Sequence, residues 1–448
     1  MALVRQISSA FLLASITLFF HGGSYAEEAA HKDVEYLSDA VGSGYEWLEQ
    51  QQRKAFGDKC RPTTMAELFA VANRLPRRDD TQTPEELFRS LGFDRIALPT
   101  RCEDFGGFVI LNRIAEEIRD AARKDKGDVQ RIVWGTLPLR EVNASAQRVG
   151  KDHVVAIDTA LFTFLYSLFL TVDRTIIIEE VGGKLGFRSS PADFSLAVQQ
   201  SPSIVRDFSA LIVAFAQGKG LPDIEFANKH EAAFVIRQLN STERFIVGHE
   251  FGHVLAGHTD KGVRFLDLPA AEGGFFRIPS LGRDWSQELE ADEIGQKLGA
   301  AARTQDESGL SQNIPPIFDV IAAYAPALFL QIADTLDDAI FCGASGKGSA
   351  REISDNDRAL LTSQISTLRD QGKKIAVSDD FARMLECRQD GHPPAWLRAE
   401  LALRRADRKF IVPPRRPPPE VNLVRALVTN SILLSQLAAP EIKRQLSQ

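Results

Sequence analysis

The decapeptide Gly248-His-Glu-Phe-Gly-His-Val-Leu-Ala-Gly257 places two histidines and a glutamate at a spacing that suits metal chemistry. His249 and His253 are four residues apart, about 400° of rotation on an α-helix, so both imidazoles leave the same face. Two imidazoles on one face can bind one Zn²⁺, and Glu250, beside the first ligand, can act on a water molecule as general base. Histidine is scarce in this chain, 8 of 448 residues. The pattern therefore favours a zinc site over a surface helix with two unrelated histidines.

The residues around this motif predict a largely buried helix of about four turns. Asn240-Ser-Thr-Glu243 has the spacing of a capping box, which predicts that the helix begins there. The apolar run Phe245-Ile-Val247 follows, and Gly257 is well placed to end the helix.

Two histidines leave a tetrahedral zinc site incomplete, and two residues compete for the third position. His258 lies five residues after His253, about 140° further round the helix, so we expect it to cap the helix end or to meet solvent. A ligand role for His258 is the alternative. The segment Ser286–Gly295 is the better source, because Glu288 and Asp292 leave one face of a predicted helix. We predict that Glu288 is the third ligand and that Asp292 binds the free N–H of a ligand histidine.

Glycines on this second predicted helix indicate close packing. Gly295 and Gly299 align with Glu288 to within about 20°. Glycine inside a helix costs about 1 kcal/mol relative to alanine, so two on one stripe predict contact with another helix. Gly248 and Gly252 offer the matching surface. The remaining acidic residues are expected to form an ordinary solvated face: Glu290 and Glu293.

The order HExxH followed by Glu288-Leu-Glu-Ala-Asp292 resembles the M48 metalloproteases, the gluzincin group that includes HtpX and the CAAX prenyl proteases. The resemblance implies a zincin-type metalloprotease core, one Zn²⁺ per chain, and hydrolysis of a protein or peptide substrate. The long transmembrane helices of the membrane members are not visible in this sequence. The same compact motif also resembles the ImmA/IrrE-type proteases, which are usually cytosolic and attached to regulators.

A segment upstream of the motif is similar to a second M48 element. Val142-Asn143-Ala144, followed by the strand-like segment Val154–Ile157, is similar to the family's VNA sequence before the substrate-binding edge strand. The resemblance implies that substrate lies extended along this strand, with Asn143, Val154 and Ala156 at the site.

A segment downstream is similar to a third element. His392-Pro-Pro-Ala-Trp-Leu-Arg398 matches the family's HPPxxxR sequence. The resemblance implies that His392 is catalytic, by helping to stabilise the transition state, and that Arg398 has a positioning role.

Residues 1–26 have the features of a secretory signal peptide. Arg5 supplies a positive charge, Ala10–Phe20 is apolar, and Ser24-Tyr-Ala26 offers small residues for cleavage. The apolar stretch is too short to predict a membrane span, so we expect an exported protein, periplasmic or secreted. An uncleaved N-terminal anchor is the alternative. Losing Arg5, the one charged residue of this segment, takes the formal charge from −7 to −8, which favours neither nucleic acid nor an anionic membrane as partner.

Cysteine usage agrees with export. The chain has four cysteines, Cys60, Cys102, Cys342 and Cys387, an even number that suits disulfides in an oxidising compartment. Proximity in sequence favours the pairs Cys60–Cys102 and Cys342–Cys387. Four buried thiols in a reducing compartment are the alternative.

Composition and patterning predict an α+β protein, mostly helical with a small sheet; 44% hydrophobic and 25% charged residues are ordinary for a globular chain. The predicted organisation is a signal peptide (1–26), an N-terminal helical region (27–125), a zincin-like peptidase domain (126–410), and a Pro-rich linker with a C-terminal helix (411–448).

Four segments carry the clearest predicted elements. Arg131–Gly135 and Val154–Ile157 are predicted strands. The apolar runs Ala160–Val172 and Ile317–Ile340 are predicted core helices, the second broken at Pro326. The first run is too short to span a membrane and the second is interrupted by aspartates, so neither is expected to do so.

Two classes of function remain open at this point. The first is a zinc-dependent endopeptidase; the second is a non-catalytic binding or chaperone-like module that zinc stabilises. A structural zinc site closes with four protein ligands and needs no base beside the metal. Glu250 is such a base, and its presence favours the enzyme.

Overall fold

The computed structural model describes residues 43–56, 105–126, 131–137, 144–181, 184–217, 219–222, 224, 229–260, 263–269, 275–281, 285–306, 317–337, 395–410 and 419–446. These residues are mostly helical with a small mixed sheet, which confirms the predicted α+β class. They divide into two compact units. The first comprises the described residues up to Thr163 and those of Gly262–Leu281; the second comprises those of Phe164–Lys261 and from Gly282 onward.

A three-stranded sheet forms the centre of the first unit, in the order β1-β3-β2. β1 (Ile132–Leu137) pairs in parallel with β3 (Asp152–Asp158), and β2 (Ala144–Val149) pairs antiparallel with β3. The prediction that Val154–Ile157 is an edge strand is therefore wrong, because β3 is paired on both sides. Its nearly continuous apolar sequence is typical of a strand buried on both faces, and this pattern does not distinguish a central strand from an edge strand.

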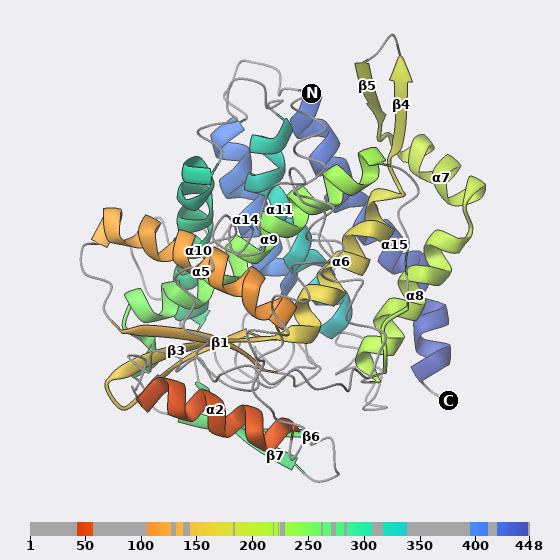
Figure 1. The fold of residues 1–448 in the computed structure, drawn as a ribbon. Helices are drawn as coiled ribbons and strands as arrows, with labels where there is room; N and C mark the ends of the chain where they lie inside the picture. Colours follow the sequence, from red (N-terminus) through yellow and green to blue (C-terminus); the bar gives the residue numbers. More distant parts are fainter. Residues whose placement is uncertain are drawn as a thin grey trace, which may run out of the picture. The chain divides into compact units, whose positions relative to one another are not determined.

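Two helices cover the opposite faces of this sheet (Figure 1). On one face, α2 (Ser43–Phe56) packs Leu48 against Val133. On the other, Trp134 donates its indole N–H to a side chain of α5 (Phe105–Lys126) at 3.2 Å. The first unit also contains an antiparallel hairpin: β6 (Val263–Pro269) and β7 (Phe275–Leu281).

The second unit is built mainly of helices. Helix α11 (Ile317–Asp337) packs most extensively against α9, α14 and α15, and together they form the core of this unit (Figure 1). The elements of this unit besides α11 are β4 (Ile177–Val181), β5 (Lys184–Arg188), α7 (Pro191–Gln200), α8 (Ser203–Ala216), α9 (Lys229–Leu255), the short 3₁₀ helix η3 (His258–Asp260), α10 (Trp285–Asp306), α14 (Ala395–Phe410) and α15 (Pro419–Leu446). Helix α6 (Thr159–Asp173) crosses the boundary between the two units.

Helix α9 carries the HExxH motif and is longer than the sequence predicts. Asn240 lies inside the helix, so the prediction that a capping box starts it there is wrong. The preceding segment 229–239 contains no glycine or proline, so nothing in it stops the helix from extending upstream. The predicted end is confirmed: α9 stops at Leu255, and Gly257 takes a positive φ of 70°.

Helices α9 and α10 pack antiparallel with their backbones in close contact, which confirms the predicted role of three glycines. A Cβ at Gly248 would lie 2.9 Å from the carbonyl oxygen of Gly295. A Cβ at Gly252 would lie 3.0 Å from a carbonyl oxygen of α10. Gly299 is different, because a Cβ there would meet its nearest atom at 3.5 Å, an ordinary contact. Short side chains on α10 can therefore reach the histidines of α9.

The long apolar helices agree in part with prediction. Helix α6 is present as predicted, whereas α11 continues through Pro326 instead of breaking there. Helix α15 includes Val421–Leu446, the one stretch among the described residues that is long and apolar enough to cross a membrane. Half of its most apolar part is buried. Buried core helices of soluble proteins meet the same criterion, so length and apolarity alone do not show whether α15 crosses a membrane.

Candidate metal centre

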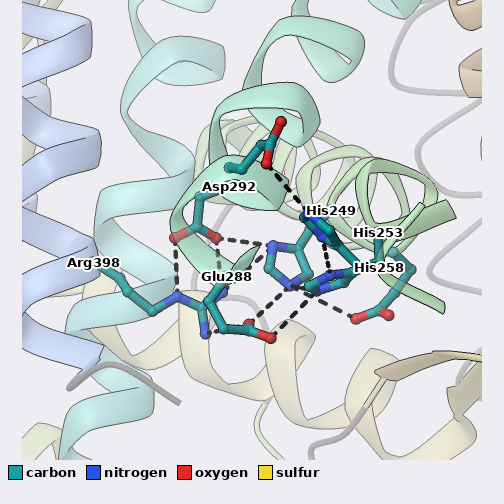
Figure 2. A network of polar contacts seen from close by, with 8 residues as sticks. His249, His253, His258, Glu288, Asp292 and Arg398 are labelled. Carbon is teal, nitrogen blue, oxygen red and sulfur yellow. Dashed lines mark hydrogen bonds and ion pairs between the residues drawn. The ribbon is translucent and has the colours of Figure 1, made fainter. Parts of the chain in front are cut away.

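Two helices of the second unit bring the predicted ligands together. His249 and His253 come from α9, and Glu288 comes from the first turn of α10. All three side chains are buried, and one ligand atom from each lies within 4.8 Å of the others. Figure 2 shows the two imidazoles and the carboxylate converging on one point. This group could hold a metal ion.

The distances fit a small tetrahedral cation. The Nε2 atoms of His249 and His253 are 3.0 Å apart. Each lies 3.4 Å from an oxygen of Glu288. Zinc ligands at bonds of 2.0–2.2 Å and tetrahedral angles would lie about 3.3 Å from one another. The donor set fits as well, because two imidazole nitrogens and one carboxylate are common protein ligands of Zn²⁺.

Glu250 lies beside this group. Its side chain is buried, and its Oε1 is 4.0 Å from Nε2 of His249. The carboxylate is thus within reach of a water molecule that shares the space in front of the two imidazoles. Among the described residues this group has three members, the number of protein ligands that is typical of catalytic zinc sites.

The Nδ1 side of His249 is held by an ion pair between a buried aspartate and a partly buried arginine. Oδ1 of Asp292 lies 2.9 Å from Nδ1 of His249, which is the contact that the sequence predicts. Arg398, from α14, donates to both oxygens of Asp292 at 2.7 and 2.9 Å. Its guanidinium also lies 3.8 Å from Glu288. Arg398 therefore braces both the carboxylate behind the first ligand and the third ligand itself (Figure 2).

The charges in this cluster shift one another's protonation. Burial lowers the pKa of His249, but its hydrogen bonds to Asp292 and Glu288 outweigh burial and raise the pKa from 6.5 to about 9. Burial raises the pKa of Asp292, but the positive charge of Arg398 and the contact with His249 hold it well below its usual range. In the metal-free protein, His249 is therefore a cation at neutral pH and Asp292 an anion.

The structure corrects the prediction for His258. The side chain neither meets solvent nor caps the helix: it is buried, and its Nδ1 lies 3.0 Å from Nδ1 of His253. Its Nε2 lies 3.2 Å from Oε2 of Glu290, whose exposed side chain reaches back to it. The helical wheel misplaces His258 because the helix has already ended. Gly257, with its positive φ, turns the chain, and η3 brings His258 against the far edge of the His253 ring. The glycine immediately before His258 is the signal in the sequence that could have revealed this turn.

The other predicted site residues belong to the first unit or lie outside the described residues. Val154 and Ala156 lie in β3 of the first unit. Asn143 and His392 lie outside the described residues, as do the signal-like segment and the four cysteines. Glu293, predicted to be solvated, is exposed on α10.

Comparison with known proteins returned no relative. No protein-family model matches this sequence, and no curated protein or solved structure matches it.

Proposed function

We propose that this protein is a zinc-dependent endopeptidase of M48-like type, in which His249, His253 and Glu288 hold the metal. The observation that carries the proposal is the meeting of these three buried ligand atoms with Glu250 next to them. Three protein ligands with a base alongside are the pattern of catalytic zinc sites, whereas structural sites are closed by four ligands. The M48 motifs occur in matching order along the chain, and Asp292 and Arg398, from two of those motifs, meet at this centre.

Each residue has a distinct task in the proposed reaction. When bound, zinc would supply Lewis-acid chemistry, which polarises the peptide carbonyl and acidifies water. Glu250 accepts the proton of the attacking water and then returns it to the leaving amine. The bracing of Asp292 and Glu288 by Arg398 keeps the imidazole and the carboxylate aimed at one point. His392 is proposed to donate a hydrogen bond to the oxyanion, as the resemblance implies.

The proposal is tested by separating metal binding from catalysis. The full-length protein, purified without chelator, should contain about one zinc per chain and should cleave casein or a mixed peptide library. Glu250→Gln keeps all three ligands but loses the proton acceptor, so zinc should stay while cleavage falls at least about a hundredfold. Glu288→Ala is the matched control, because it removes a ligand and should lose the zinc itself.

A structural zinc site is the second candidate, and the burial of the group favours it. His253 and Glu288 are fully buried, with exposed fractions of 0%. Such a site would bind zinc equally in wild type and Glu250→Gln, and neither protein would cleave any peptide. Cleavage that is equal in the two proteins would instead contradict the role of Glu250 and with it the proposed mechanism.

A further inference from the structure

We propose that His258 is a positioning residue of the metal site: it accepts a hydrogen bond from Nδ1–H of His253 and so directs the other nitrogen of that ring to the metal. The inference rests on the proposed zinc site. It concerns a residue outside the HExxH and ExxxD motifs, and it assigns that residue a task in holding the second ligand.

The direction of the first hydrogen bond follows from the metal. Nε2 of His253 faces Nε2 of His249 and Glu288, so it must offer a lone pair to a bound cation. A neutral imidazole has one N–H, and with Nε2 unprotonated that hydrogen is on Nδ1. Nδ1 of His253 lies 3.0 Å from Nδ1 of His258. His253 is therefore the donor and His258 the acceptor.

The second hydrogen bond agrees with this direction of the first. Because Nδ1 of His258 accepts, its own hydrogen is on Nε2. That nitrogen lies 3.2 Å from Oε2 of Glu290, and an ionised carboxylate can only accept. The chain His253–His258–Glu290 thus has one consistent arrangement of hydrogens when metal is bound. It starts at a fully buried ligand and ends at a carboxylate whose side chain is 59% exposed.

The backbone holds His258 in this place. Helix α9 ends two residues after His253, and the N–H of Gly257 bonds the carbonyl oxygen of Val254 at 3.0 Å. The positive φ of Gly257 then reverses the chain, and His258 begins η3 with only 5% of its surface exposed. The turn fixes the position of the backbone. The imidazole is held in addition by its two ring nitrogens, which contact groups from two different helices (Figure 2).

Two substitutions in the full-length protein separate the hydrogen bond from packing. His258→Phe keeps a ring of similar shape but has no acceptor, whereas His258→Asn is smaller and keeps an acceptor oxygen near the position of Nδ1. Zinc affinity, measured by competition with a chelator, should fall about 10–100-fold in His258→Phe, as for other partners of ligand histidines. His258→Asn should stay within about threefold of wild type. The visible absorption spectrum of the cobalt-loaded protein should change in His258→Phe and be restored in His258→Asn.

A role in packing alone predicts the opposite order, with His258→Phe close to wild type and His258→Asn weaker, and that order would overturn the inference.

Glu290→Ala should weaken zinc binding more than Glu293→Ala, which removes the same charge from the same helix. The zinc-loaded wild type offers a measurement without substitution. Histidine ¹⁵N chemical shifts should show the hydrogen of His258 on Nε2, and finding it on Nδ1 would refute the proposal.

These outcomes are distinguishable from failure of the proposed function. If the wild type binds no zinc, the metal site itself is wrong and this inference falls with it. If the wild type binds zinc and His258→Phe binds it equally well, the inference alone is wrong. Loss of zinc affinity in His258→Phe with recovery in His258→Asn supports the positioning role whether or not the bound zinc is catalytic.

Discussion

The two ligand histidines leave the same face of one helix but are supported from behind in different ways. Behind His249 lies the ion pair of Asp292 and Arg398, contributed by two other helices. Behind His253 lies a second imidazole, His258, from the turn that follows the same helix. One support is an ion pair from two other helices, and the other is an imidazole from the turn after α9, which itself contacts Glu290 of α10. The two histidines of an HExxH motif can therefore lie in different chemical environments although they share one helix face.

The difference has a physical consequence for each ligand. A carboxylate behind an imidazole makes the ring more basic and a stronger competitor for protons. A neutral imidazole orients its partner without adding charge. We therefore expect the first support to control proton competition and stability, and the second to control mainly the direction of a ring nitrogen.

The largest expected effect is from Asp292→Asn. It would leave the partly buried guanidinium of Arg398 without the carboxylate that it binds most closely, and breaking a buried ion pair by removing one member typically costs about 3–5 kcal/mol. The free energy of unfolding of the metal-free protein, from urea denaturation, should fall by that amount, and zinc affinity should fall about 10–100-fold. His258→Phe serves as the comparison and should lose much less stability. Equal losses in the two variants would contradict the contrast drawn between the supports.

A medium effect is expected from pH. Because the pKa of His249 in the metal-free protein is raised to about 9, zinc must displace a proton at neutral pH. Zinc affinity should therefore rise about tenfold per pH unit between pH 7 and 9.

Since the folded-state pKa of His249 lies above the ordinary value of 6.5, the stability that protonation adds to the metal-free protein is complete below about pH 6.5. That stability is lost as the pH rises through about 9.

Calorimetry in buffers of different ionisation enthalpy measures the protons released on zinc binding. The wild type and His258→Phe should each release about one proton from His249 at pH 7, in addition to any from bound water. Asp292→Asn should release fewer, because the main hydrogen bond that raises the pKa of His249 is weakened. A proton count that is unchanged in Asp292→Asn would show that the charged support does not govern the basicity of His249.

The smallest effect is expected from Gly257→Ala. An added Cβ would meet no atom within 4 Å, so the cost comes from the positive φ alone, about 1–2 kcal/mol for a residue other than glycine. Relief of that strain would move His258 away from His253, and we expect zinc affinity to fall by less than about tenfold. Thermal unfolding and chelator competition measure the two losses. Gly220→Ala is the control, because its added Cβ would also meet nothing within 4 Å and no positive φ is involved. An equal loss of zinc affinity in both variants would contradict the role of the Gly257 turn in placing His258.

Several features were predictable because they depend on helical geometry and on residue type. The four-residue step fixes that His249 and His253 share a face, and the same step relates Glu288 to Asp292. The matched glycines Gly248 and Gly295 indicated that the two helices approach closely, and the structure confirms it. The end of the helix was predictable as well, from a glycine at the right distance.

Other features could not be predicted, because they depend on what lies across from an element or beyond its end. Nothing in the sequence shows that β3 is paired on both sides, since pairing depends on two other strands. Helix α9 begins well before Asn240, because the helical segment upstream and its packing stabilise the helix more than a cap at Asn240 would.

The sequence by itself therefore determined the candidate metal-binding face of this protein: two histidines, a glutamate beside them, and a second helix with an acidic residue one turn after the proposed third ligand. Only the tertiary structure decided the partners of that face. Arg398 reaches Asp292 across 106 positions of sequence, and His258 reaches His253 because the chain turns after the helix has ended. The physical reason is that helical periodicity fixes the direction of a side chain relative to its own axis. It carries no information about which groups other segments place in that direction.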